Sequence, residues 1–154
     1  MIQEGQPAID FTLPASNGQE VSLSDFRGKY VVLYFYPKDM TPGCTTEACD
    51  FRDYHKNFTE LNTVILGVSR DKIASHEKFI QKYELPFLLL SDPEAKVCEQ
   101  YGVFKEKTMF GKKVMGIERS TFIIDQEGIV RKIYRKVKVK DHVKEALKFI
   151  QEQL

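Results

Sequence analysis

The pattern of hydrophobic positions divides the first half of the chain into buried strands and a one-sided helix. Residues 30–36 form an unbroken β-branched and aromatic run, which predicts a central strand buried on both faces. Apolar side chains then recur at helical spacing over residues 43–61, with an inner stripe of Cys44, Ala48, Phe51, Phe58 and Leu61. Residues 64–69 read as a second buried strand. This strand, helix, strand order predicts parallel pairing of the two strands.

The pattern repeats more loosely in the middle of the chain. A helical stripe is formed by Ile73, His76, Ile80 and Tyr83. A short strand at 87–90 and a short helix at 93–101 follow it. Helices and strands therefore alternate through this half, as in an α/β protein.

The last third of the chain follows a different order. Strands at 121–124 and 129–134 flank an Asp-Gln-Glu-Gly turn, which predicts an antiparallel hairpin. A closing helix is indicated by Val143, Ala146, Leu147, Ile150 and Leu154. Turn signals at 17–18 and 27–28 predict a small N-terminal hairpin. The expected fold is one α/β domain over residues 1–154, a thioredoxin-like fold with a central mixed sheet flanked by helices and an N-terminal hairpin extension.

Composition and charge narrow the class of protein. The chain has 42% hydrophobic and 29% charged residues, as in a soluble globular protein, and its net charge of +1 gives no reason to expect nucleic acid or a membrane as a partner. We find no basic and apolar leader and no apolar run near the ~18 residues of a membrane span, so we expect a cytoplasmic protein. Three cysteines are too few for a disulfide-stapled scaffold, so we expect thiols.

Candidate chemistry is concentrated just after the first buried strand, where open α/β sheets place their ligands. Pro42 and Gly43 lead into the predicted helix, so Cys44 falls in its first turn. Unpaired backbone N–H groups and the positive end of the helix dipole stabilise a thiolate there. We therefore expect Cys44 to be a largely ionised, partly exposed nucleophile.

Two further side chains have the chemistry that attack on a peroxide requires. Thr41 precedes Cys44 by three residues, and its hydroxyl can orient a peroxide as donor or acceptor. Negative charge develops on the departing oxygen and needs a nearby donor or cation. Arg119 is the candidate, because the topology allows the segment before the strand at Ser120 to pass beside the first helix.

Together these residues resemble the peroxiredoxin pattern Pro-x-x-x-Thr-x-x-Cys, here Pro37, Thr41 and Cys44, with Arg119 as the distant arginine. The segment from Gly43 to Arg52 is further similar to the bacterioferritin comigratory protein or peroxiredoxin Q subgroup. The resemblance implies that Cys44 is peroxidatic and that Cys49 is resolving. It also implies a hydroperoxide substrate held by a loop that includes Pro37 and Gly43, no cofactor, a thioredoxin-like reductant and a monomer.

Helix geometry adds a condition to that resemblance. Residues five apart on an ideal helix are separated by roughly 8.7 Å between Cα atoms and about 140° in direction. A disulfide requires Cα atoms within about 7 Å of each other. The first turns of the helix must therefore unwind before Cys44 and Cys49 can bond.

Other features have simpler explanations. Cys98 has apolar neighbours at helical spacing, so we expect a packed core thiol. Residues 109–115 are expected to form a Lys-tipped hairpin or loop beside the site. The three histidines, His55, His76 and His142, stand at no spacing that suggests a metal site with the cysteines, and we expect no metal.

Two rival functions remain open at this stage. A thiol-disulfide exchange protein of the thioredoxin type shares the fold, but such proteins carry Cys-x-x-Cys and a proline where this chain has Ser120. The other rival is a non-catalytic binding or chaperone protein that retains the fold. Measuring peroxide loss with a thioredoxin system would separate the three functions.

Overall fold

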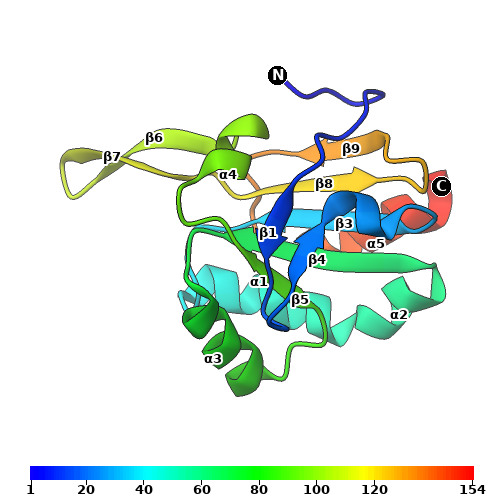
Figure 1. Ribbon diagram of the computed structural model, residues 1–154, viewed down its shortest axis with the longest axis horizontal. Coiled ribbons are helices and arrows are strands. Elements are labelled where there is room, and N and C mark those ends of the chain that lie inside the picture. The colour runs from blue at the N-terminus through cyan, green and yellow to red at the C-terminus, as the bar shows by residue number, and fades with distance from the viewer.

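The computed structural model covers residues 1–154 and is built around a five-stranded mixed sheet with the strand order β5-β4-β3-β8-β9 (Figure 1). Its strands are β3 (Tyr30–Phe35), β4 (Thr63–Ser69), β5 (Leu88–Ser91), β8 (Ser120–Ile124) and β9 (Val130–Tyr134). The helices are α1 (Pro42–Asp53), α2 (His55–Glu60), α3 (Ile73–Tyr83), α4 (Lys96–Gln100) and α5 (His142–Gln153), and η1 (Leu23–Phe26) is a short 3₁₀ turn. Two separate hairpins are formed by β1 (Thr12–Pro14) with β2 (Glu20–Ser22) and by β6 (Phe104–Met109) with β7 (Lys112–Ile117).

The strand pairings confirm the predicted fold class. Strands β3, β4 and β5 pair in parallel, whereas β8 pairs antiparallel with both β3 and β9. The N-terminal hairpin is present as β1 and β2. The result is a central mixed sheet flanked by helices, begun by parallel crossovers and completed by a hairpin and a helix.

The central strand β3 divides its side chains between the two hydrophobic cores. Val31, Leu33 and Phe35 belong to the cluster under β1, β2 and α4. Val32 and Tyr34 belong to the cluster that packs against α1, α2, α3 and α5. Because successive strand side chains point to opposite faces, an unbroken apolar run is what a strand covered on both sides requires. The predicted burial of this strand on both faces is confirmed.

The single helix predicted over 43–61 is wrong, because the chain forms two helices that meet at Tyr54. There the backbone has φ −99° and ψ 6°, and α1 ends while α2 begins one residue later. Phe51 and Phe58 are both fully buried in the same cluster. The predicted apolar stripe is therefore retained on both sides of the break.

The hairpin of β6 and β7 extends away from the body of the molecule (Figure 1). It confirms the hairpin expected over 109–115, but its apex is Phe110-Gly111 and not a lysine, with φ of 51° and 77° as in a type I′ turn. Phe110 is 99% exposed.

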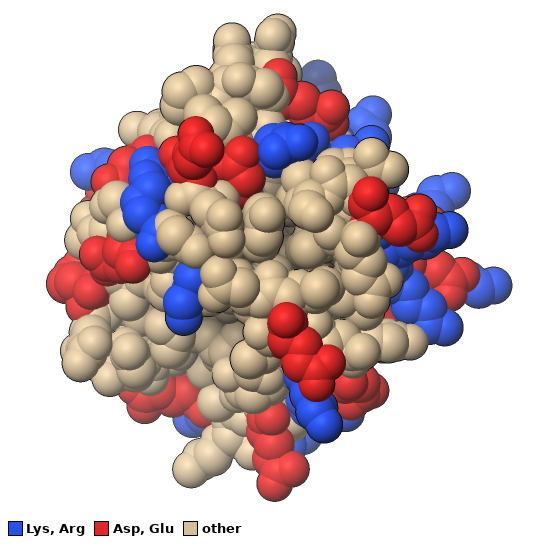
Figure 2. All heavy atoms as spheres, turned by 90° about the vertical axis from the view of Figure 1, so that its right-hand side faces the viewer, with Lys and Arg blue, Asp and Glu red and all other residues tan.

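On the face shown in Figure 2, basic and acidic side chains are interspersed, in keeping with the net charge of +1. None of the helices is long and apolar enough to cross a bilayer.

Candidate active site

Cys44 lies in the first turn of α1, directly beyond the carboxyl end of the central strand. Pro42 occupies the start of the helix, where its missing N–H is not needed, and Thr41 in extended conformation is the residue before it. The first backbone N–H groups of a helix have no intrahelical acceptors. At the start of α1 they are therefore available to a group bound near Cys44. The predicted helix start is confirmed.

The expectation that Cys44 is partly exposed is wrong. Its residue is 1% exposed and belongs to the core cluster that contains Ala48 and Phe51. The helical stripe that places these side chains against the sheet also carries the sulfur inward. A molecule in solution therefore reaches the sulfur only if neighbouring residues move.

Arg119 covers the sulfur from the side, as the sequence predicted. Its Nη2 lies 3.4 Å from Cys44 Sγ, although the two residues are 75 positions apart. The backbone carbonyl of Arg119 accepts a hydrogen bond of 3.0 Å from Val137, which ties this position to the segment before α5. A guanidinium at this distance stabilises a negative sulfur and can donate to an oxygen bound there.

Gly43 makes room for this guanidinium. A Cβ atom at position 43 would lie 3.1 Å from Arg119 Nη2, closer than most side chains tolerate. The glycine therefore allows the close approach of Arg119 to the start of α1. This is a steric role for a residue that the resemblance had placed with the substrate.

Glu47 is a site residue that the sequence analysis missed. It is fully buried one turn after Cys44, and its Oε1 accepts a hydrogen bond of 2.8 Å from Arg119 Nη1. Burial raises the pKa of Glu47 to about 7, against the opposing effect of the Arg119 charge. The signal for it was an acidic residue on the apolar stripe of α1, three positions after the cysteine. Such a residue needs a cationic partner inside the fold.

Thr41 and Pro37 lie beside the site on the loop between β3 and α1. The Thr41 hydroxyl donates a hydrogen bond of 2.8 Å to the carbonyl oxygen of Lys38, so its own oxygen remains available as an acceptor. Both residues line a cavity of about 490 Å³ that also includes Lys107, Met109 and Met115 of the protruding hairpin. The cavity offers an approach to the loop.

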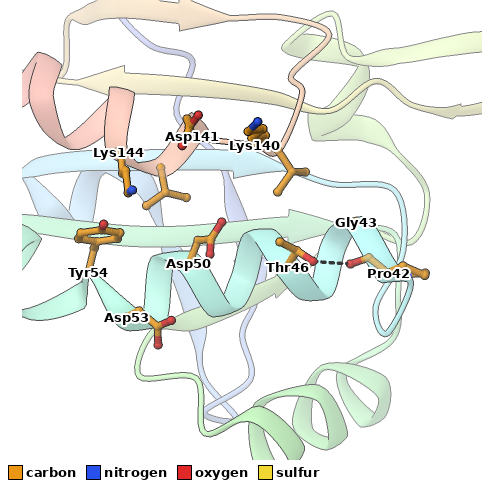
Figure 3. A pocket seen from close by; sticks show the side chains of 11 residues that line it. Pro42, Gly43, Thr46, Asp50, Asp53, Tyr54, Lys140, Asp141 and Lys144 are labelled. Atoms are coloured by element: carbon orange, nitrogen blue, oxygen red, sulfur yellow. Dashed lines mark hydrogen bonds between the residues drawn. The ribbon is translucent and has the colours of Figure 1, made fainter.

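Cys49 lies on the same helix as Cys44, and neither forms a disulfide here. It is half-buried, and burial raises the pKa of its thiol. The outer flank of α1 borders the largest cavity, of about 840 Å³, between this helix and the start of α5 (Figure 3). Figure 3 shows Thr46 and Asp50 on one wall and Lys140 and Lys144 on the other.

Cys98, predicted as a core thiol, is fully buried, which confirms that prediction.

Sequence comparison gives consistent matches over nearly the whole chain. A family model described as the AhpC/TSA family matches residues 4–133. Peroxiredoxin Bcp of Bacillus subtilis is 60% identical over 151 residues, which are 98% of this chain and 96% of the relative. Peroxiredoxin Bcp of Escherichia coli is 40% identical over 151 residues, 98% of this chain and 97% of the relative.

Solved structures agree with these matches. A crystal structure of a PrxQ mutant from Xylella fastidiosa has a TM-score of 0.93 at 39% identity and covers 98% of this chain and 96% of that one. The bacterioferritin comigratory protein of Xanthomonas campestris, described in connection with its alkyl peroxide reduction activity, has a TM-score of 0.87 at 44% identity. The match covers 92% of this chain and 90% of that one.

Proposed function

This chain belongs to the AhpC/TSA family and is a thiol-dependent peroxidase of the Bcp/PrxQ type, and from that premise we propose that Cys44 is its peroxidatic residue. The observation that carries the proposal is the 3.4 Å contact between Cys44 Sγ and Arg119 Nη2 at the start of α1. Neither of the other two thiols has a guanidinium in hydrogen-bonding contact.

In the first step the Cys44 thiolate attacks the nearer oxygen of the hydroperoxide. The O–O bond breaks, the sulfur becomes a sulfenic acid, and the other oxygen leaves as hydroxide or alkoxide and takes up a proton. Arg119 donates to the developing negative charge, and the Thr41 hydroxyl oxygen accepts the hydrogen bond of the incoming hydroperoxide. Pro37 shapes the loop, and Gly43 admits the guanidinium.

In the second step the Cys49 sulfur attacks the sulfenic sulfur of Cys44, releasing water and closing a Cys44–Cys49 disulfide. Both cysteines lie within α1 here, so the first turns of this helix must open for the bond to form. The cavity in Figure 3 borders this part of α1 and gives the opened segment room to move. The dithiol of a thioredoxin-like protein then reduces the disulfide.

The remaining parts of the proposal concern substrate and setting. We assign hydrogen peroxide and organic hydroperoxides as substrates, because the cavity beside Thr41 is lined in part by Met109 and Met115 and leaves room for an alkyl group. We further propose that residues 1–154 act as one domain, as a monomer in the cytoplasm, with no nucleic acid or membrane partner.

The test combines turnover with identification of the disulfide. Peroxide consumption driven by a thioredoxin system should be robust, and mass spectrometry of the peroxide-treated protein under non-reducing conditions should find Cys44 linked to Cys49. Hydrogen exchange should show protection lost over residues 42–50 in the oxidised protein, while β3 and β4 stay protected. A bond from Cys44 to Cys98 would reassign the resolving residue.

A further inference from the structure

The loop that carries Thr41 rests on a buried polar cluster outside the proposed site. Its centre is Asp39, which is 5% exposed, and His76 of α3, which is fully buried. His76 Nδ1 lies 2.7 Å from Asp39 Oδ2. Two polar side chains buried this completely are costly unless they are hydrogen-bonded, so the contact needs an explanation.

Further polar partners hold the two side chains in place. His76 Nε2 lies 3.0 Å from the carbonyl oxygen of Leu90, which can only accept, so Nε2 donates this bond. Asp39 accepts hydrogen bonds from the hydroxyls of Tyr36, at 2.6 Å, and Ser75, at 2.8 Å. With the contact between Asp39 Oδ2 and His76 Nδ1, every polar side-chain atom of the pair has a partner.

A metal is a poor explanation for the cluster. Asp39, Asp71 and His76 do bring three possible ligand atoms within 4.8 Å of one another. Asp71 Oδ2, however, already accepts hydrogen bonds from the Ser69 hydroxyl, at 2.6 Å, and from the backbone N–H of Asp39, at 2.9 Å. The remaining two ligand atoms are occupied by their mutual bond. The donor set is therefore satisfied internally, and its effect is to hold Asp39 by both side chain and backbone.

Holding Asp39 also holds Thr41. Between them Met40 has φ +66°, a left-handed conformation that an unbranched residue adopts only when the surroundings impose it. The Thr41 hydroxyl donates to Lys38, the residue before Asp39, so the loop closes on itself around the anchored position. A contiguous path runs from His76 through Asp39 to the hydroxyl beside Cys44.

We propose that the Asp39–His76 pair is a positioning pair that fixes the Thr41 hydroxyl for peroxide attack and keeps it fixed while α1 opens. This inference rests on the role proposed above for Thr41. The anchor comes from α3 and β4, which lie outside the segment that must unwind. The loop therefore survives each opening and gives α1 a constant point from which to refold.

The experiment separates peroxide positioning from the general integrity of the site. Asp39→Asn and His76→Gln are made singly and together, and two rates are measured at Cys44: single-turnover oxidation by hydrogen peroxide, and alkylation by iodoacetamide. Each single variant should lower the peroxide rate about tenfold, because misplacement of a positioned group is that costly, and the double variant should lose little more. Alkylation, which does not use the Thr41 hydroxyl, should change less than about twofold.

Two controls keep the result interpretable. Phe79→Leu truncates another fully buried side chain of α3 and should lower stability while leaving both rates near those of the unchanged protein. Ser75→Ala removes one donor to Asp39 and leaves the contact between Asp39 and His76 in place, so it should disturb folding less. It should show the same selective loss at roughly two- to threefold, the lower end of what one hydrogen bond contributes.

Three results would contradict the positioning role, and a fourth would contradict the proposed function. An unchanged peroxide rate in folded His76→Gln protein, or an equal loss of both rates, would overturn the positioning role. If Thr41→Val leaves the peroxide rate unchanged while His76→Gln lowers it, the pair does not act through Thr41 and the inference is also wrong. Full peroxidase activity in Cys44→Ser would instead contradict the proposed function itself.

Discussion

Cys44 and Cys98 occupy similar positions in two halves of the molecule, yet their surroundings differ in charge. Both are free thiols, with exposed fractions of 1% and 0%, and both lie in the first turn of a helix. Cys44 contacts the Arg119 guanidinium. The backbone N–H of Cys98 instead donates to Asp92, at 2.8 Å, and burial together with that carboxylate raises the pKa of the Cys98 thiol well above its usual value.

The comparison shows that burial and helix position do not by themselves make a cysteine reactive. The two residues share both properties but differ in the nearest charged group, which is a guanidinium at the Cys44 sulfur and a carboxylate at Cys98. Their cores differ as well: Cys44 belongs to the cluster beneath α1, whereas Cys98 is packed on the opposite face of the sheet. Four predictions follow the comparison from its largest expected effect to its smallest.

Replacing each of the two cysteines by serine should give the largest difference in peroxidase activity. We expect Cys44→Ser to abolish peroxide reduction and Cys98→Ser to change turnover by less than about twofold, because only the first sulfur can be oxidised by substrate. Stopped-flow measurement of peroxide consumption with excess reductant makes the comparison. Comparable losses in the two variants would show that the charge around each cysteine does not determine its role.

Removing the guanidinium should make the Cys44 site resemble the Cys98 site. We expect Arg119→Gln to slow single-turnover oxidation of Cys44 by roughly a hundredfold, the scale of losing one donor to a developing oxyanion. Arg119→Lys should recover only part of the rate, because an ammonium cannot bond Glu47 and the sulfur with the fork that Arg119 uses. A lysine variant equal to the original would mean that only net charge matters.

Replacing Glu47 should remove a pH dependence that its buried carboxyl creates. Its pKa is about 7 in the folded protein and 4.5 in the reference state, so the folded protein binds more protons between these values. Its contribution to stability is therefore fully present below pH 4.5 and is lost as the pH rises to about 7. Glu47→Gln should flatten the fall in unfolding free energy across that window, by an amount on the order of 3 kcal/mol.

Denaturant unfolding at several pH values between 4.5 and 8 measures this effect. Glu60→Gln, at the exposed end of α2, is the control and should retain the original pH slope. A slope unchanged in Glu47→Gln would show that Glu47 does not take up a proton on folding.

The smallest effect is expected at Cys98. Asp92→Asn removes the carboxylate but leaves the thiol buried, so labelling of Cys98 by a thiol reagent in native protein should rise only a fewfold and should stay far slower than labelling of Cys49. Mass spectrometry after timed labelling resolves the three cysteines. Rapid labelling of Cys98 in Asp92→Asn would show that charge, more than burial, protects it.

Much of this site could be predicted from the sequence because its signals are local. The unbroken apolar run of β3, the Pro42-Gly43 entry into α1 and the position of Cys44 are set by neighbours in the chain, and all appear in the structure. Arg119 could be placed because it directly precedes β8, and β8 pairs with β3.

The parts that sequence reasoning missed depend on packing between distant segments. The break at Tyr54 has no local signal, because Phe51 and Phe58 lie on one stripe of an uninterrupted helix as well as in the observed cluster. Glu47 carried a signal, an acid on an apolar stripe, but its partner lies 72 positions away. His76 read as one member of a helical stripe, and only its contact with Asp39 reveals a polar role.

The bend at Tyr54 also has a consequence for timing. It makes α1 a separate helix of 12 residues, and the turns that must open precede Phe51, whose ring lies 6.0 Å from the ring of Phe58 in α2. Local unfolding of a packed segment takes microseconds to seconds, and the Cys44–Cys49 disulfide can close only while the first turns of α1 are open. The fraction of time that α1 is open then divides the Cys44 sulfenic acid between disulfide closure and a second peroxide, which gives the irreversible sulfinic acid. A more stable α1 should therefore yield an enzyme that inactivates after fewer turnovers at high peroxide concentration.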